Sequence, residues 1–226
     1  MGVSLRSVLE DPRVYVAYQK GVGAHRSRYR LMEEAELKPG ERVLDVGCGP
    51  AYYLNRLPDV DYVGFDTCKS YVEYARRRSR GRGDFRCEFL AKEHVGELGQ
   101  FDAVLLFGLL HHIADAECAA LLDLCAGVLA PGGRVLSCDT ALHAGQRRVS
   151  RWMSEHDRGA HVRRPEEYDD LASKCFDRVE GHLDDTLCRI PIALYLMRMT
   201  EPQARVADPV RSKPSAREAT REEGRW

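Results

Sequence analysis

Short apolar runs alternate with amphipathic segments through the middle of the chain. The apolar runs predict five strands, at residues 42–46, 62–65, 85–90, 101–107 and 134–138. Between them, apolar residues recur at helical spacing and predict helices at 51–57, 69–80 and 114–130. Strands that alternate with helices form a parallel sheet covered on both faces. The near-continuous apolar run 103–107 fits a strand buried on both sides.

The two ends of the chain follow a different rhythm. Residues 4–37 carry apolar side chains at roughly helical spacing and predict helices interrupted at Gly21 and Gly23. After the fifth strand the pattern predicts a helix at 141–157, a helix that begins at Pro165, and strands at 176–183 and 190–199. Residues 201–226 hold charges and prolines without periodicity, which predicts a disordered tail.

Composition describes an ordinary globular protein. The chain has 226 residues, of which 44% are hydrophobic and 31% charged, enough for one sizeable core. The net charge of −1 gives no whole-chain electrostatic case for nucleic-acid or membrane binding, and no apolar run approaches the ~18 residues of a membrane span. Residues 1–13 contain no apolar signal-peptide core, so we expect a cytoplasmic protein. The eight cysteines lack C-x-x-C spacing, which predicts reduced thiols and no metal site.

One apolar strand runs directly into a glycine-rich turn, Val43 to Ala51, which contains Gly47 and Gly49. A second apolar run ends in Asp66, 17 residues after Gly49. Glycines let the backbone approach a ligand closely, and an acid at the end of the next strand accepts hydrogen bonds from ribose hydroxyls. The pairing predicts a nucleoside cofactor across the carboxyl ends of two parallel strands.

Four segments resemble, in order and in spacing, the class I S-adenosylmethionine-dependent methyltransferases, particularly their small-molecule branch. The four segments are the glycine turn, the acid Asp66, Phe101–Asp102 leading into Leu109–His112, and the turn at 129–133. The resemblance is strong over residues 40–140 and extends to residue 199 only in the order of elements. It implies an α/β fold: a Rossmann-like, seven-stranded, mostly parallel sheet with helices on both faces and a C-terminal antiparallel hairpin. It also implies S-adenosyl-L-methionine as the cofactor.

The resemblance assigns residues to the cofactor site. The contacts that it implies are Asp45, Gly47, Cys48, Gly49, Asp66, Thr67, Phe107 and Gly108. Asp45 would lie near the methionine end; for Asp45 and Phe107 the alternative is a structural role, and Asp66 also suits a helix N-cap. The chain departs from the family pattern in two places. Ala51 replaces the third glycine of the pattern. At the end of the third strand many relatives carry an acid beside the adenine amine; here the candidate acid, Glu88, is displaced, or adenine is held by stacking alone.

His111 and His112 are the candidate catalytic residues, because they follow the fourth strand at the cofactor edge. A sulfonium is already a good methyl donor, so the protein mainly holds the reactants in line, and a base is needed only where the nucleophile begins protonated. An unperturbed imidazole titrates near pH ~6.5 and suits that task. The alternative is that these histidines cap or pack the helix that follows.

Substrate contacts are expected from the N-terminal helices and from the segment after Asp139. We assign Tyr15, Tyr18 and Arg158 to the substrate site, and the alternative for the two tyrosines is core packing. Arg28 or Arg30 is a further candidate, for the cofactor carboxylate. The polar loop 157–164 suits either an anionic substrate or an internal salt-bridge cluster. The arginines at 76–78, 80 and 82 are interpreted as a solvated helix face, since no aromatic interleaving supports nucleic-acid binding.

The sequence thus predicts one methyltransferase domain over residues 1–200. Its parts are an N-terminal helical lid (1–38), a cofactor-binding core (40–140), a substrate-side insertion (141–175) and a C-terminal hairpin (176–199), followed by a tail at 201–226. We expect methyl transfer to the oxygen or nitrogen of a small organic acceptor, in bacterial secondary metabolism, by a monomer or homodimer without nucleic-acid or membrane partners. The alternatives are a non-catalytic or non-methylating S-adenosylmethionine-binding protein, and an NAD-dependent oxidoreductase, which Tyr52 disfavours because a dinucleotide turn needs glycine there.

Overall fold

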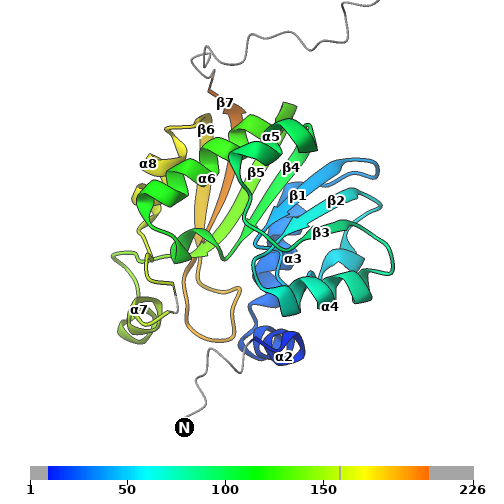
Figure 1. Cartoon of the computed structure of the whole chain (residues 1–226). Coiled ribbons are helices and arrows are strands. Elements are labelled where there is room, and N and C mark those ends of the chain that lie inside the picture. The colour runs from blue at the N-terminus through cyan, green and yellow to red at the C-terminus, as the bar shows by residue number, and fades with distance from the viewer. Residues whose placement is uncertain (1–9, 158, 204–226) are drawn as a thin grey trace, which may run out of the picture.

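The computed structural model describes residues 10–157 and 159–203. Its seven strands form one sheet in the order β3-β2-β1-β4-β5-β7-β6. The strands are β1 (Arg42–Val46), β2 (Asp61–Phe65), β3 (Asp84–Arg86), β4 (Phe101–Phe107), β5 (Leu129–Thr140), β6 (Phe176–Asp184) and β7 (Leu194–Pro202). Strands β1 to β5 are parallel, and β7 pairs antiparallel with both β5 and β6 (Figure 1). The expected Rossmann-like sheet with its C-terminal antiparallel hairpin is confirmed.

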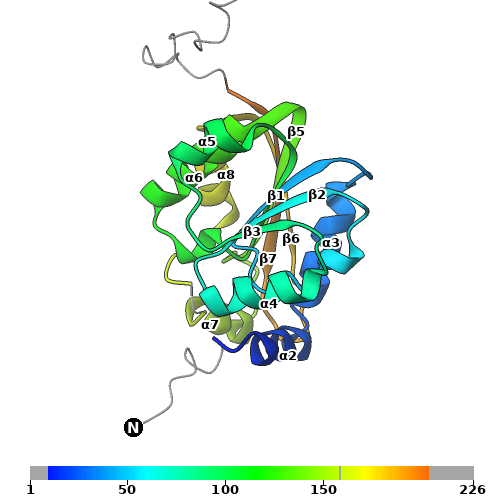
Figure 2. The same ribbon diagram turned by 45° about the vertical axis from the view of Figure 1, so that its right-hand side comes forward.

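Helices cover both faces of this sheet. They are α2 (Pro12–Val22), α3 (His25–Ala35), α4 (Lys69–Ser79), α5 (Lys92–Leu98), α6 (Asp115–Val128), α7 (Arg148–Glu155) and α8 (Pro165–Ala172), with short 3₁₀ turns η1 (Leu54–Arg56) and η2 (Leu110–His112). Figure 2 shows α5, α6 and α8 on one side of the sheet and α3 on the other, while α2 and α7 lie together beyond one end of it.

Alternating residues of each strand supply two separate hydrophobic clusters. Leu44 of β1 belongs to the cluster beneath α5, α6 and α8, whereas its neighbour Val43 belongs to the cluster beneath α3, α4 and η1. Successive side chains of a strand point to opposite faces, so a strand buried on both sides contributes to both clusters. Strand β4 shows this most fully, because all of its residues except Asp102 are buried.

Arg134 of β5 joins the start of the sheet to the end of α3. Its guanidinium is buried and forms two hydrogen bonds with Glu41, at 3.1 and 2.8 Å. It also donates to the carbonyl oxygens of Ala35, Glu36 and Asp102. A planar guanidinium can satisfy this many acceptors at once, which an ammonium cannot. This one side chain therefore fixes where α3 leads into β1.

The helix predicted at 51–57 is wrong: the structure has only the 3₁₀ turn η1 there. Ala51, which replaces the third glycine, adopts a φ of +43°. A residue in the left-handed region cannot belong to a right-handed helix, so the chain continues as a turn until Leu54. Pro58 follows and permits no extension.

Four further boundaries differ from the sequence-based prediction. The third strand was expected over 85–90, but as an edge strand it ends at Arg86. Helix α5 was not predicted, because it has only seven residues and includes Gly96. The fifth strand is longer than expected: it includes the predicted turn 131–133 as a register shift against β4. The helix expected at 141–157 shortens to α7, because residues 141–147 form an extended and turning segment that includes Gly145.

The ends of the chain also differ in detail. Helix α2 continues through Gly21 and ends at Gly23, whose φ of +83° terminates it. Strand β7 begins at Leu194 rather than at 190 and extends to Pro202, so Glu201 and Pro202, assigned to the tail, belong to the sheet. The rest of the predicted tail from 204 lies outside the described residues.

We predict that Arg134→Ala lowers the free energy of unfolding by about 3 kcal/mol, because it leaves buried carbonyls and the Glu41 carboxylate without their donor. Urea denaturation measures the loss. Arg151→Ala, which removes an exposed ion pair on α7, is the control and should cause no measurable change. Equal stability of the two variants would show that Arg134 does not hold α3 to the sheet.

Candidate functional site

Three strands deliver candidate residues to one edge of the sheet. In the register, Val46 of β1 lies opposite Phe65 of β2 and Leu106 of β4. The residues that follow, Gly47, Asp66 and Phe107, therefore emerge at the same level. This is the carboxyl edge of the parallel strands, where open α/β sheets bind their ligands.

Asp66 connects the glycine turn to the end of β2. Its Oδ2 accepts a hydrogen bond from the Gly49 backbone N–H at 2.8 Å, and its Oδ1 accepts one from Cys68 N–H at 2.8 Å. Burial raises the pKa of Asp66 above its ordinary value, and the two backbone donors oppose that rise. Each carboxylate oxygen has a further lone pair, which leaves capacity for ribose hydroxyls. The sequence-based alternative of an N-cap holds only in part, because Cys68 is the N-cap residue of α4.

The glycine turn has the backbone conformation that its glycines predict. Gly47 and Gly49 adopt φ angles of +77° and +56°, in the left-handed region that favours glycine. A Cβ added at Gly49 would have one neighbouring atom within 4 Å, in the Tyr15 ring at 4.0 Å. The space beside Gly49 is therefore open, with Tyr15 at its boundary.

Asp45 is completely buried at the end of β1. Its Oδ2 accepts hydrogen bonds from the hydroxyls of Tyr53 and Tyr62, at 2.5 and 2.6 Å, while its Oδ1 has no partner among the described residues. Burial raises the pKa of Asp45 to about 6, against the tyrosine hydrogen bonds, which lower it. The sequence did not predict these hydrogen bonds to Asp45, because nothing in it distinguishes Tyr53 and Tyr62 from other buried core residues.

Cys48 and Thr67, two further cofactor candidates, differ in burial. The Cys48 thiol is buried against Gly64, where a Cβ would lie 2.9 Å from its sulfur. Its backbone N–H donates to Phe65 O at 3.0 Å. Thr67 is exposed. Any contact of Cys48 with a ligand is therefore through its carbonyl.

The other predicted residues surround one cavity, of about 320 Å³, which we call the central cavity. It lies among α2, the ends of β4 and β5, α7 and the loop before β7. The predicted residues that line it are Tyr15, Tyr18, Phe107, Gly108, His111 and His112. Further lining residues that the sequence analysis did not assign to a ligand include Gln19, Cys138, Thr140, Trp152 and Ile192. Arg158 lies outside the described residues.

Arg28 of α3 also lines the central cavity, and only neutral groups hold it. It donates to Gln19 Oε1 at 2.7 Å, to the Tyr52 hydroxyl at 3.2 Å and to the Tyr15 hydroxyl at 3.1 Å. None of the described carboxylates forms an ion pair with it. A half-buried guanidinium that forms no ion pair with the described residues has the capacity to bind an anion. Arg30, the other arginine considered, is exposed and pairs with Glu34 instead.

His111 is buried between two carboxylates. Its Nδ1 lies 2.8 Å from Asp139 Oδ1, and its Nε2 lies 3.5 Å from Asp157 Oδ1. Burial acts to lower the pKa of His111, but the two carboxylates outweigh it and raise the pKa to about 9. Burial acts to raise the pKa of Asp157, but the contact with His111 outweighs it and lowers that pKa to about 2. The two carboxylates therefore favour the protonated form of His111, in contrast to an unperturbed imidazole.

The loop after α7 encloses His111 closely. A Cβ added at Gly159 would lie 2.1 Å from the His111 ring, so only glycine fits there. His161 N–H donates to the His111 carbonyl at 3.0 Å. The buried Arg163 binds Asp115 at 2.7 Å and donates to the carbonyls of η2 and of Ile113. The polar loop was interpreted either as an anionic-substrate site or as an internal salt-bridge cluster. The ion pair of Arg163 with Asp115 fits the second interpretation.

Comparison with known proteins gives the family. A family model described as a methyltransferase domain matches residues 43–133. The probable tRNA methyltransferase 9B of Mus musculus is 31% identical over 153 residues, which cover 65% of this chain and 32% of that protein. Phosphoethanolamine N-methyltransferase 1 of Arabidopsis thaliana is 30% identical over 138 residues, which cover 58% of this chain and 28% of that protein. The chain thus matches about a third of the length of these relatives.

A solved structure agrees at the level of fold. Phosphoethanolamine N-methyltransferase 2 of Haemonchus contortus, in complex with phosphomonomethylethanolamine and S-adenosylhomocysteine, superposes with a TM-score of 0.66 at 17% identity, over 89% of this chain and 61% of that chain. Residues 43–133 belong to a methyltransferase-domain family, and the fold around them is that of the class I S-adenosylmethionine-dependent methyltransferases. The class I resemblance inferred from the four sequence segments is confirmed, whereas relatives named for tRNA and for phosphoethanolamine leave the small-molecule branch a proposal.

The residues of this methyltransferase fit S-adenosylmethionine. Asp66 has free acceptor capacity for a ribose, and the glycine turn is open beside it. Asp45 Oδ1 is a buried acceptor without a partner, suited to an ammonium or an ordered water. Arg28 offers a cation for a carboxylate. A nucleoside joined to an amino acid carries all three of these groups.

The described residues contain neither a membrane-spanning helix nor a cluster of metal ligands. None of their helices has both the length and the apolar composition needed to cross a bilayer. Within the same residues, no group of His, Cys, Asp and Glu side chains has an arrangement able to hold a metal ion.

Sequence reasoning missed the contacts that surround His111. Asp139 had a signal, because it ends an apolar strand at the sheet edge where ligands bind. Asp157 and Gly159 were noted only as part of the polar loop 157–164, and their contact with His111 had no signal, because it depends on the path of an irregular loop. Arg28 was one of two candidates, and only its neutral partners separate it from Arg30.

We predict that His111 titrates near pH 9 in the folded protein, measured by NMR of its ring nitrogens. The unfolded imidazole releases its proton near pH ~6.5. The stabilisation by the charged pair is therefore complete below pH ~6.5 and is lost as the pH rises to about 9, so the free energy of unfolding falls over this interval.

Asp157→Asn should lower the pKa of His111, because it removes one of the two carboxylates. Glu155→Gln is the matched control: it removes a nearby carboxylate that pairs with Arg151 on the outer side of α7 and should leave the pKa unchanged. A wild-type pKa at or below the ordinary value would refute the arrangement.

Proposed function

We propose that the protein transfers the methyl group of S-adenosylmethionine to an oxygen or nitrogen atom of a small organic acceptor. The observation that carries the proposal is the opening of the glycine turn, Asp66 and the central cavity at one edge of the sheet. The bound cofactor supplies an electrophilic methyl group on a sulfonium. The protein's task is then to orient the acceptor, exclude water and remove a proton.

In this proposal each end of the cofactor has its own residue. Asp66 accepts hydrogen bonds from the ribose hydroxyls, and Gly47 and Gly49 allow close approach of the backbone. Arg28 pairs with the methionine carboxylate, and Asp45 Oδ1 receives the amino group or a water bound to it. Phe107 and Gly108 line the central cavity between the residues assigned to these two ends.

The central cavity supports a small and largely apolar acceptor. Its volume of about 320 Å³ is at the lower end of ligand sites, and the part beside Arg28 and Phe107 belongs to the cofactor in this proposal. Tyr18, Trp152 and Ile192 contribute aromatic and aliphatic surface to its lining. The relatives are named for tRNA and for phosphoethanolamine, which are unlike molecules, so their names do not indicate one acceptor class.

His111 is the proposed base. Its neutral form is the minor one at pH 7, because Asp139 and Asp157 hold its proton. A base with a raised pKa binds a proton strongly once it is free to accept one. Its neighbour His112 also lines the cavity, with the two ring centroids 4.1 Å apart, and is the second candidate.

The cofactor assignment predicts a separation between two ligands. Arg28→Met should weaken binding of S-adenosylhomocysteine at least tenfold, because it removes the cation for the carboxylate. It should leave the affinity for 5′-methylthioadenosine, which lacks the amino-acid carboxylate, within twofold. Asp66→Ala should weaken both ligands, since both contain the ribose. Isothermal titration measures the affinities.

Arg30→Met is the control for this set, because Arg30 is exposed on the same helix and pairs with Glu34. Equal weakening of both ligands by Arg28→Met would remove Arg28 from the carboxylate site. Binding of NAD in place of S-adenosylmethionine would favour the oxidoreductase alternative.

Methyl transfer itself is tested by the release of S-adenosylhomocysteine in the presence of pooled phenols, alcohols and amines. With an acceptor so identified, we predict that turnover rises about tenfold per pH unit between pH 7 and about 9, as His111 becomes neutral. His111→Gln should lose this rise and keep its affinity for S-adenosylmethionine.

A flat pH profile in the wild type would exclude His111 as the base while leaving the methyltransferase assignment intact. Tight cofactor binding without product from any acceptor would instead favour a non-methylating role.

A further inference from the structure

A second cavity lies outside the site described above. It has a volume of about 860 Å³ and lies between the start of α2, the 3₁₀ turn η1 and helix α4. Arg13, Arg77, Arg78 and Arg80 line it together with Tyr74 and Asn55, and we call it the arginine cleft. None of its lining residues is shared with the central cavity.

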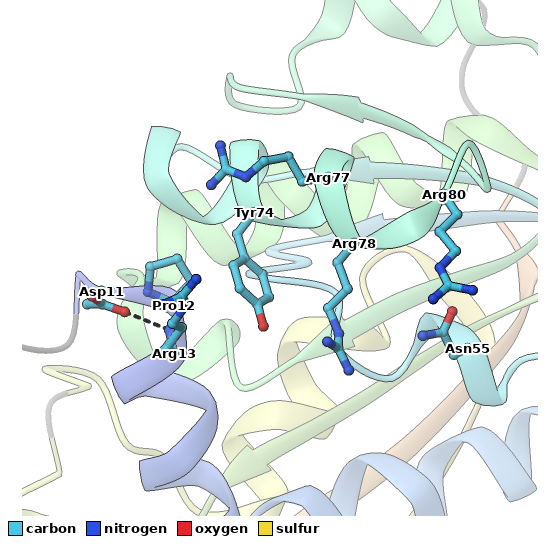
Figure 3. Close-up of a pocket in the computed structure, with 8 residues that line it drawn as sticks. All are labelled: Asp11, Pro12, Arg13, Asn55, Tyr74, Arg77, Arg78 and Arg80. Carbon is cyan, nitrogen blue, oxygen red and sulfur yellow. Dashed lines mark hydrogen bonds between the residues drawn. The ribbon is translucent and has the colours of Figure 1, made fainter.

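Several side chains of the arginine cleft extend into a common space. Figure 3 shows the Tyr74 hydroxyl and the Arg78 guanidinium extending from α4 in the same direction, with Arg80 directed toward Asn55, whereas Arg77 extends from the other side of α4. Arg13 approaches from the first turn of α2. Residues from three separate elements therefore surround one opening.

Most of these arginines have no structural task. Arg13, Arg78 and Arg80 form no side-chain ion pair or hydrogen bond with the described residues, and Arg77 has only a long ion pair with Glu73, at 3.8 Å. This differs from the other arginines of the same segment. Arg76 donates to the Phe85 carbonyl, and Arg82 donates to those of Leu57 and Pro58.

The positive charge of the cleft is not balanced locally. Its one acidic lining residue, Asp11, accepts from the backbone N–H groups of Arg13 and Val14 and so caps α2. The whole chain has 34 basic and 35 acidic residues, so four arginines in one opening reflect segregation of charge rather than a basic protein. The four arginines are exposed, so solvent screens their mutual repulsion, and a bound anion would compensate their charge.

We propose that the arginine cleft binds a ligand that carries two or more phosphoryl groups. Guanidinium forks match the geometry of phosphate oxygens and form paired, charge-assisted hydrogen bonds with them. The Tyr74 hydroxyl and the Asn55 amide add neutral donors beside the charges. A volume of about 860 Å³ exceeds the need of one phosphate and fits a chain of them. Arg77, Arg78 and Arg80 are exposed, as the interpretation of a solvated face expects, and the proposal gives this exposed face a ligand.

The cleft adjoins the helix that bounds the central cavity. Tyr15, which lines that cavity, contacts Tyr71 of α4 with ring centroids 5.0 Å apart, and Ser70 of α4 donates to the Glu10 carbonyl just before α2. Phosphoryl groups in the cleft would therefore be held against the same helix, α2, that borders the reaction site. The proposal does not depend on the methyl-transfer assignment, because phosphate binding is measurable without turnover.

The test compares two double variants of the full chain. Arg78→Gln/Arg80→Gln removes two charges from the cleft, and Arg147→Gln/Arg148→Gln removes two exposed charges at the start of α7. Inorganic tripolyphosphate is titrated into each at ~150 mM salt. We expect saturable binding that is at least tenfold weaker in the cleft variant and within twofold of wild type in the control, with S-adenosylmethionine affinity unchanged in both.

An eight-nucleotide single-stranded RNA distinguishes the two sources of phosphate. Tighter binding of RNA than of tripolyphosphate, with a smaller salt dependence in the cleft variant, identifies a nucleic-acid backbone. Binding of tripolyphosphate alone identifies a small phosphorylated molecule. Absence of binding by both probes, or equal weakening in the two double variants, overturns the proposal.

Discussion

The parallel register of β1 with β2 and β4 decides where every candidate functional residue lies. Because Val46 lies opposite both Phe65 and Leu106, the chain leaves all three strands at one level. A shift of one residue in either pairing would turn the buried side chains to the wrong face and separate Asp66 from the glycine turn. The two hydrophobic clusters thus hold the binding edge in place.

This constraint explains why the sequence predicts the sheet and the cofactor edge well. Parallel strands buried on both faces are near-continuous apolar runs, and their ends are marked by glycine or by an acid such as Asp66. The failures occur where no apolar period exists. Helix α5 has only seven residues, too few to show a clear period. The turn after Gly49 depends on Ala51 in the left-handed conformation, which alanine rarely adopts, so its presence in the sequence gives no sign of the turn.

The surroundings of His111 mark the limit of sequence reasoning about the site. Its position after β4 is readable, but its charge state depends on Asp139, 28 residues away, and on Asp157, 46 residues away. Asp157 reaches the ring because Gly159 allows the loop to pass against it and Arg163 fixes that loop to η2. Contacts between an irregular loop and a strand end follow from packing, which composition and periodicity do not encode.

The two cations of the central cavity are compensated in opposite ways. Arg28 is held by an amide and two phenols, which orient it without neutralising it, so its charge remains available to an anion. His111 is held by two carboxylates, so the protein more than compensates its positive charge. One wall of the cavity therefore carries an uncompensated cation, and the other carries one imidazole between two carboxylates. An amino-acid carboxylate suits the first wall, whereas an anion at the second wall would be repelled by Asp139 and Asp157.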